Sequence, residues 1–117
     1  MTHERLVELL CKPGEDILRS ITPLDCHLNH VVPCILGEAG ELWDVIKKHT
    51  IYRQDLDMEN VIEELGDIEF YLEATRQALF IPRDVTLEAN IKKLMTRYKT
   101  LKYSDDQARA RGDKKGL

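Results

Sequence analysis

The sequence contains no apolar run that approaches the roughly 20 residues needed to cross a membrane as a helix. Its N-terminal stretch, MTHERLVELLCKPGED, also lacks the layout of a signal peptide, because acids interrupt a short apolar segment. We therefore expect a cytoplasmic protein that does not associate with membranes.

Cysteine is also scarce. Cys11, Cys26 and Cys34 are odd in number and form no CxxC pair, so a disulfide framework is not expected and the thiols should be reduced. His27 and His30 lie three residues apart, but no cysteine or histidine partner stands at a zinc-ligand spacing. These absences exclude the common structural zinc modules.

An excess of positive charge is missing too. The 17 Lys+Arg residues face 21 Asp+Glu residues, which gives a formal net charge of −4. This balance disfavours a nucleic-acid-binding surface, and the lack of a basic recognition helix disfavours a helix-turn-helix DNA binder. With 43% hydrophobic and 32% charged residues, the 117-residue chain has the composition of one globular domain.

Apolar residues recur at helical spacing along the chain, and no segment reads as a convincing strand. We predict an all-α bundle of four main helices plus a short terminal helix. The expected helices cover residues 3–11, about 22–48, about 57–79, about 84–101, and a last one that starts at the capping box SDDQ, residues 104–107. We expect a single domain over residues 1–117, with its core at about 22–112 and a mobile basic tail at 112–117.

Local signals mark where these helices begin and end. KPGED at 12–16 should end the first helix, since proline and glycine disfavour its continuation. Thr22, Pro23 and Asp25 form a strong start signal for the second helix. Inside that helix, Pro33 removes one hydrogen bond and predicts a kink or a broken turn near residues 29–33.

Four carboxylates stand in two pairs, Glu38 and Glu41 in GEAGEL and Glu64 and Asp67 in EELGD. Each pair is spaced i, i+3, which places both acids on one face of a helix. An isolated ExxE is common on solvated helices, but both pairs here lie beside apolar stripes, where an unpartnered acid is costly. Mg²⁺ prefers carboxylate oxygens, so four converging acids indicate a magnesium site.

The neighbours of these acids are informative as well. Gly37 and Gly40 flank Glu38, and Gly66 precedes Asp67. Glycine is unfavourable inside a helix, by about 1 kcal/mol relative to alanine. Its presence beside acids in both helices suggests the close approach of a backbone or a ligand.

Each acid pair also belongs to a longer line of residues. Cys34 shares the helix line of Glu38 and Glu41, and Tyr71 shares that of Glu64 and Asp67. Two antiparallel helices would bring the two lines face to face.

Three segments resemble the MazG-like all-α nucleoside triphosphate pyrophosphohydrolases: GEAGELWDVIKKH, ENVIEELGDIEFYL and EANIKKLMTRY. The resemblance covers roughly residues 25–112. The family pattern is ExxE, a spacer and ExxD. Here it is Glu38-x-x-Glu41 and Glu64-x-x-Asp67, with 22 residues between.

The resemblance implies a Mg²⁺-dependent hydrolysis of a nucleoside or deoxynucleoside triphosphate to the monophosphate and pyrophosphate, with Mn²⁺ as a substitute metal. It implies a small-molecule nucleotide as the partner, and a homodimer or homotetramer. It assigns Glu38, Glu41, Glu64 and Asp67 as metal ligands. Glu38 or Glu41 is our candidate for the catalytic base. Glu63, next to the ligands, would support them or face solvent.

Substrate contacts are expected on the next helix. Asn90, Lys93 and Arg97 fall at i, i+3, i+7, and the family has a similar segment there. Ammonium and guanidinium groups bind phosphate oxygens, although a solvated polar face would look the same in sequence. His27 lies in the region where relatives contact the nucleotide. It is either a wall of the pocket or a surface residue.

Two other functions remain open at this point. A relative acting on phosphoribosyl-ATP or another modified nucleotide would carry the same acids. A non-hydrolytic nucleotide-binding or interaction module could use the same bundle, but it has no need of all four acids. Because Trp43 and Phe70 stand beside the acid lines and few helices carry many apolar residues, we expect at least a dimer.

Overall fold

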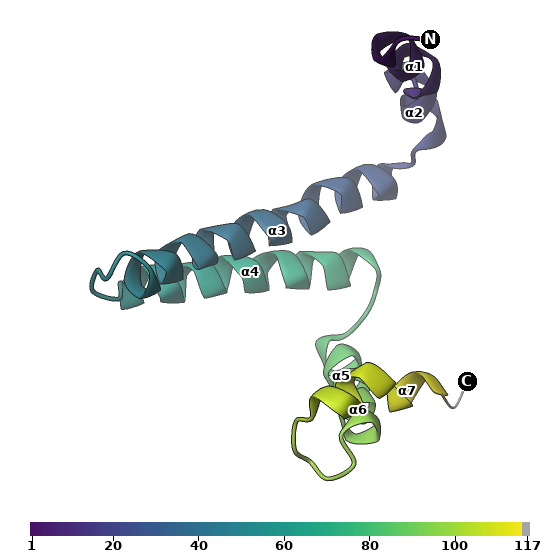
Figure 1. Cartoon of the computed structure of the whole chain (residues 1–117). Coiled ribbons are helices and arrows are strands. Elements are labelled where there is room, and N and C mark those ends of the chain that lie inside the picture. Colours follow the sequence, from purple (N-terminus) through teal and green to yellow (C-terminus); the bar gives the residue numbers. More distant parts are fainter. Residues whose placement is uncertain (116–117) are drawn as a thin grey trace. The chain divides into compact units, whose positions relative to one another are not determined.

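A computed structural model describes residues 1–115, which contain helices and no strand. The prediction of an all-α fold is therefore confirmed. The helices are α1 (His3–Leu10), α2 (Gly14–Ser20), α3 (Pro23–Thr50), α4 (Met58–Ala78), α5 (Arg83–Arg97), α6 (Asp105–Ala110) and α7 (Gly112–Lys115) (Figure 1). None of the helices in the described part has both the length and the apolar character needed to cross a bilayer.

Helix α2 was not expected. Helix α1 ends at Leu10, and Pro13, in an extended conformation, then stands at the N-cap of α2. Glu15 and Asp16 then place negative charge in the first turn, where the helix dipole favours it. Arg19 pairs with Asp16 at 2.7 Å. The sequence pattern over 12–16 is therefore a junction between two helices.

Helix α3 begins as predicted. The Asp25 amide donates to the Thr22 hydroxyl at 3.1 Å, and the Thr22 amide donates to the Asp25 carboxylate at 2.9 Å. The predicted broken turn at Pro33 is wrong, because α3 runs without interruption from Pro23 to Thr50. A proline costs the helix one hydrogen bond, and the remaining bonds and the packing along α4 keep this helix intact.

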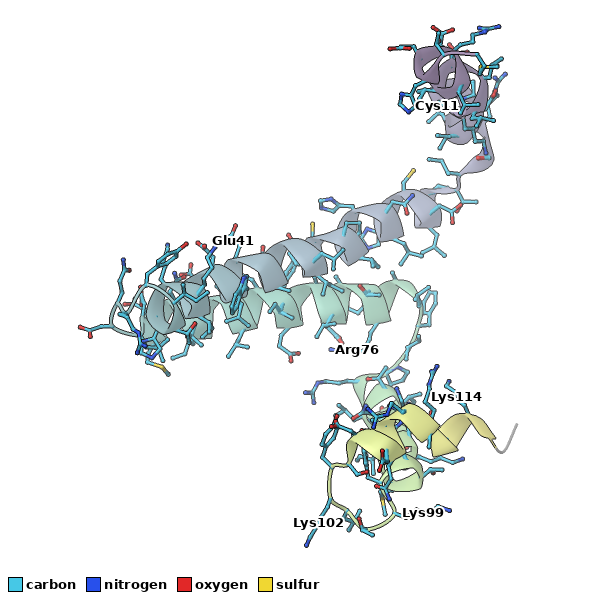
Figure 2. The ribbon with its side chains drawn as sticks, viewed as in Figure 1. Cys11, Glu41, Arg76, Lys99, Lys102 and Lys114 are labelled. Atoms are coloured by element: carbon cyan, nitrogen blue, oxygen red, sulfur yellow. The ribbon has the colours of Figure 1, made fainter. Side chains whose placement is uncertain are left out.

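The chain divides into two compact units, Met1–Ala78 and Leu79–Leu117. In the first unit, α4 runs back along α3, so that the two long helices lie side by side (Figure 1). Val31 and Val45 are the only buried hydrophobic residues of the described chain, with 4% and 6% exposure. Figure 2 shows side chains projecting outward from both helices along their length. Much of the predicted apolar stripe is thus open in a single chain.

In the second unit, α5 contacts both α6 and α7. Helix α5 ends at Arg97 rather than near residue 101, because the chain turns back there and the Tyr98 ring packs 5.5 Å from that of Tyr103. The last capping box is confirmed in part, since the Gln107 amide donates to the Ser104 hydroxyl at 3.1 Å. The chain then turns into α7.

The expected mobile tail, residues 112–117, is helical over Gly112–Lys115, and residues 116–117 lie outside the described part. The Arg97 guanidinium donates to the Asp113 carboxylate at 3.0 Å and attaches α7 to α5. A side chain at Gly112 would lie 3.4 Å from the Thr96 carbonyl oxygen, so the backbones approach closely here. The segment Gly112–Lys115, which the sequence suggested was part of a mobile tail, is therefore attached to α5 by one ion pair.

Candidate metal site

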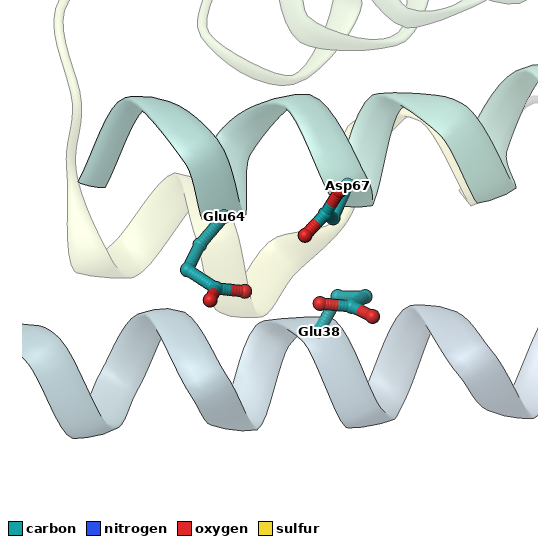
Figure 3. Close-up of side chains that lie close together, drawn as sticks. All are labelled: Glu38, Glu64 and Asp67. Atoms are coloured by element: carbon teal, nitrogen blue, oxygen red, sulfur yellow. The ribbon is translucent and has the colours of Figure 1, made fainter. Parts of the chain in front are cut away.

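Three of the predicted acids meet where α3 faces α4. Glu64 and Asp67 lie on one face of α4, and Glu38 reaches toward them from α3 (Figure 3). One carboxylate oxygen from each residue lies within 4.8 Å of the other two. Such a group of hard oxygen ligands, contributed by two rigid helices, can hold one divalent cation.

The electrostatics of the cluster centre on Glu64. Its pKa is raised from 4.5 to about 6, chiefly because burial disfavours the charged form. The hydrogen bond with Glu38 raises it further, as do the negative charges of Glu38, Asp67 and Glu41. Like charges held this close repel one another and are stabilised by a proton or a cation.

The residues present fit a divalent metal ion. The Glu64 Oε2 atom is buried and has no hydrogen-bond partner among the described residues. Buried polar atoms are almost always paired, so an orphaned carboxylate oxygen within an acid cluster calls for a ligand. A cation satisfies this oxygen and offsets the repulsion in one step.

Glu41 is not part of this three-residue group. Its side chain is exposed on α3 (Figure 2), and it acts on Glu64 through its charge alone. The rotation of α3 against α4 brings Glu38 to Glu64 and Asp67, and it leaves Glu41, about 60° further around the helix, outside the group. The structure thus brings together three of the four predicted metal ligands.

The glycines beside the acids face open space. An added Cβ at Gly37, Gly40 or Gly66 would meet no atom within 4 Å. The close approach of another backbone, which the sequence suggested, is therefore absent within the described chain. The space beside the acids is therefore open at these three glycines.

Two further residues, which the sequence placed on the acid lines without a role, lie near the cluster. A hydrogen bond with the Cys34 thiol, together with the charge of that group, raises the pKa of Tyr71; burial and the charges of Glu38 and Asp67 add to the shift. Cys34 lies one turn before Glu38, and Tyr71 one turn after Asp67. The i, i+4 spacing that put both residues on the acid lines thus also predicts that they lie next to the site.

His27 and Glu63 lie apart from this cluster. Both are exposed. His27 stands on α3 roughly 16 Å along the helix axis from Glu38, at 1.5 Å per residue. Glu63 neighbours Glu64 in the chain but is not a member of the acid group. Their roles toward a nucleotide or the metal ligands stay predictions.

The expected substrate contacts belong to the second unit. Asn90 and Lys93 are exposed on α5. Arg97 is half-buried, and its guanidinium is engaged with Asp113, so a phosphate would have to share or displace that partner. Lys93 is therefore the freer of the two predicted phosphate-binding cations.

Comparison with known proteins adds one finding. A family described as the MazG nucleotide pyrophosphohydrolase domain matches residues 27–102, which is more than half of the chain. This range includes the three clustered acids and the predicted contacts Asn90, Lys93 and Arg97. Neither the curated proteins nor the solved structures gave a match.

Proposed function

This chain belongs to the MazG nucleotide pyrophosphohydrolase domain family, and from that membership we propose that it hydrolyses a nucleoside or deoxynucleoside triphosphate to the monophosphate and pyrophosphate in the presence of Mg²⁺. The observation that carries the proposal is the cluster of Glu38, Glu64 and Asp67, with its orphaned Glu64 oxygen. Carboxylates arranged in this way serve phosphate chemistry through a metal ion.

In the proposed mechanism, Glu38, Glu64 and Asp67 hold the cation. A divalent metal bound there supplies Lewis-acid polarisation of phosphate oxygens and lowers the pKa of water. The remaining task of the protein is to accept a proton from the attacking water and to position the triphosphate. Glu38 is one of the three clustered acids and would be occupied by the cation, so the exposed carboxylate of Glu41, outside that group, is the freer base.

The test is a product analysis. We would incubate the protein with each nucleoside and deoxynucleoside triphosphate and Mg²⁺, then measure pyrophosphate and orthophosphate separately. We expect the protein to release pyrophosphate, and we expect this release to stop when a chelator is added in excess. Orthophosphate as the direct product, or full activity in chelator, would refute the proposal.

Lys93→Ala should raise KM for the nucleotide by about tenfold, the usual effect of losing one charge-assisted hydrogen bond. Metal binding should not change, because Lys93 is not among the clustered acids. Steady-state kinetics and a metal titration measure the two effects. Lys99→Ala is the matched control, since Lys99 is also an exposed lysine of the second unit. If Lys93→Ala and Lys99→Ala had the same KM, Lys93 would not contact the phosphates of the substrate.

We also propose that the protein works as a homodimer or homotetramer. Trp43 and Phe70 are 53% and 66% exposed, and Leu36 and Ile62 are 76% and 66% exposed on the same two helices. Large exposed apolar areas mark interaction surfaces, and obligate interfaces resemble a core cut in half. A second copy of the chain would cover these side chains.

Light scattering at micromolar concentration should therefore give at least twice the 13.6 kDa mass of one chain. Phe70→Glu should lower that mass, because a charge would be placed in the apolar contact. The control is Glu69→Gln, at the adjacent exposed position. A wild-type mass near one chain, with activity retained on dilution, would contradict the proposal.

A further inference from the structure

Helix α7 lies outside the matched domain and packs on a helix inside it. The family match ends at residue 102, whereas α7 covers Gly112–Lys115. Within the second unit, α7 contacts α5 (Figure 1). A helix of four residues has too few hydrogen bonds to be stable alone, so its position depends on these contacts. The interactions that hold α7 to α5 therefore decide whether this helix is docked or free.

The contact between the two helices centres on one ion pair. The Arg97 Nε atom donates to the Asp113 Oδ1 atom at 3.0 Å, and the two side chains are only 15% and 10% exposed. The hydrogen bond with Asp113 raises the pKa of Arg97. Although burial opposes the ionisation of Asp113, the hydrogen bond from Arg97 keeps its pKa below the usual value. Both groups are therefore charged near neutral pH, and Asp113 occupies the guanidinium as long as α7 is docked.

Two features of the backbone allow α7 to dock and to leave as a unit. A Cβ atom at Gly112 would lie 3.4 Å from the Thr96 carbonyl oxygen, so glycine lets the start of α7 lie against α5. Arg111, between α6 and α7, has a φ of 49°, in the left-handed region that is unfavourable for a residue with a side chain. Release of α7 would free Arg111 from this conformation. This single residue is thus the natural hinge of α7.

We propose that α7 is an autoinhibitory latch, in which Asp113 occupies Arg97 in place of a substrate phosphate and must leave before the substrate binds there. This inference rests on the proposed function, because Arg97 is one of its predicted phosphate contacts. A carboxylate and a phosphate accept the same charge-assisted hydrogen bonds from a guanidinium, so the two compete for it. The apparent affinity for the substrate is therefore reduced in proportion to the fraction of molecules in which α7 is free.

The direct test is an NMR titration of the ¹⁵N-labelled full chain with inorganic tripolyphosphate and Mg²⁺. This probe carries the phosphate chain of a triphosphate without base or sugar. In the docked helix, the Lys114 amide donates to the Arg111 carbonyl at 2.8 Å. We expect the Gly112 and Lys114 amide signals to move toward those of an unstructured peptide as the probe saturates, because α7 is displaced. Signals of α7 that stay in place would overturn the proposal.

This titration needs no hydrolysis. If the protein released no pyrophosphate from any nucleotide, the proposed function would be refuted, whereas displacement of α7 by tripolyphosphate would still be observed. The two proposals therefore fail on different measurements.

Two variants open the latch by different means. Asp113→Asn removes the charge that holds Arg97. Gly112→Val keeps that charge and adds methyl groups where a Cβ atom would already lie 3.4 Å from the Thr96 carbonyl oxygen. Each variant should lower KM for the nucleotide about three- to tenfold at an unchanged kcat, because more molecules have α7 free. Spectra that are unchanged outside α7 would show that the rest of the chain is folded.

Asp106→Asn is the matched control, because it removes the same charge from the same unit at a side chain that is 94% exposed. Its KM should equal that of the wild type. An unchanged or higher KM in both Asp113→Asn and Gly112→Val would overturn the proposal. A lower KM in Asp113→Asn alone would also overturn it, since the effect would then come from the lost charge and not from the release of α7. If hydrolysis were absent, the affinities for tripolyphosphate would give the same comparison.

Discussion

Asp67→Asn is expected to reduce Mg²⁺-dependent turnover by about a thousandfold or more while leaving the helices folded, since metal ions supply several kcal/mol of charge stabilisation in such reactions. Asp67 contributes one of the three carboxylates that lie within 4.8 Å of one another. Asparagine keeps the shape of the side chain and removes its charge. Glu38→Gln should have a similar effect, and isothermal titration should show weaker Mg²⁺ binding in both variants.

Glu41→Gln offers a sharper comparison. Glu41 lies outside the group of three acids, so its variant should lose kcat while it retains most of its Mg²⁺ affinity. This pattern is expected of a base and not of a ligand. Glu69→Gln, at an exposed position on α4, should keep full activity.

The metal-free Asp67→Asn protein should also melt at a higher temperature than the wild type, because one of several repelling charges is gone. Near-normal turnover in both Asp67→Asn and Glu38→Gln would exclude the metal site.

The second large effect is a dependence on pH. The stability of the metal-free protein and its affinity for Mg²⁺ should change in opposite directions as the pH rises. In the metal-free protein, Glu64 has a pKa of about 6, above its ordinary 4.5, so the folded state holds this proton more tightly than the unfolded state. The contribution of Glu64 to stability is present below about pH 4.5 and is lost as the pH rises through about 6. The free energy of unfolding should therefore fall between these values.

The affinity for Mg²⁺, in contrast, should increase as the pH rises. A cation requires the ionised carboxylate, and a group of pKa about 6 is mostly protonated near pH 5 and mostly ionised near pH 7. Protonation of Glu64 alone should weaken the apparent Mg²⁺ affinity about tenfold across this range. Urea unfolding in chelator and calorimetric Mg²⁺ titrations, both near pH 5 and pH 7, measure the two trends.

Glu64→Gln is the decisive variant because glutamine does not titrate. Both pH dependences should become much smaller in it, and its Mg²⁺ affinity should be low throughout. Glu63→Gln, the exposed neighbour, is the matched control and should keep the wild-type trends. If Glu64→Gln retained the full pH dependence of stability in chelator, the raised pKa would have to belong to another group.

Local sequence patterns were enough to predict where α3 and α6 begin and what chemistry the acids offer. Thr22 and Ser104 cap the helices that they were predicted to begin, because a cap depends on residues within one turn. The i, i+3 spacing of Glu64 and Asp67 puts them on one face of α4 by helix geometry alone. Family membership also followed from the order and spacing of the acids, as the match over residues 27–102 shows.

Which acids meet depends on how α3 packs against α4. The register and rotation of α3 against α4 bring Glu38 to Glu64 and Asp67, and they leave Glu41 exposed about 60° around the helix. The pairing of Arg97 with Asp113, which turned an expected mobile tail into a docked helix, joins residues 16 positions apart. Neither outcome is encoded in a local pattern, because each depends on how two helices pack and on which charges that packing removes from water.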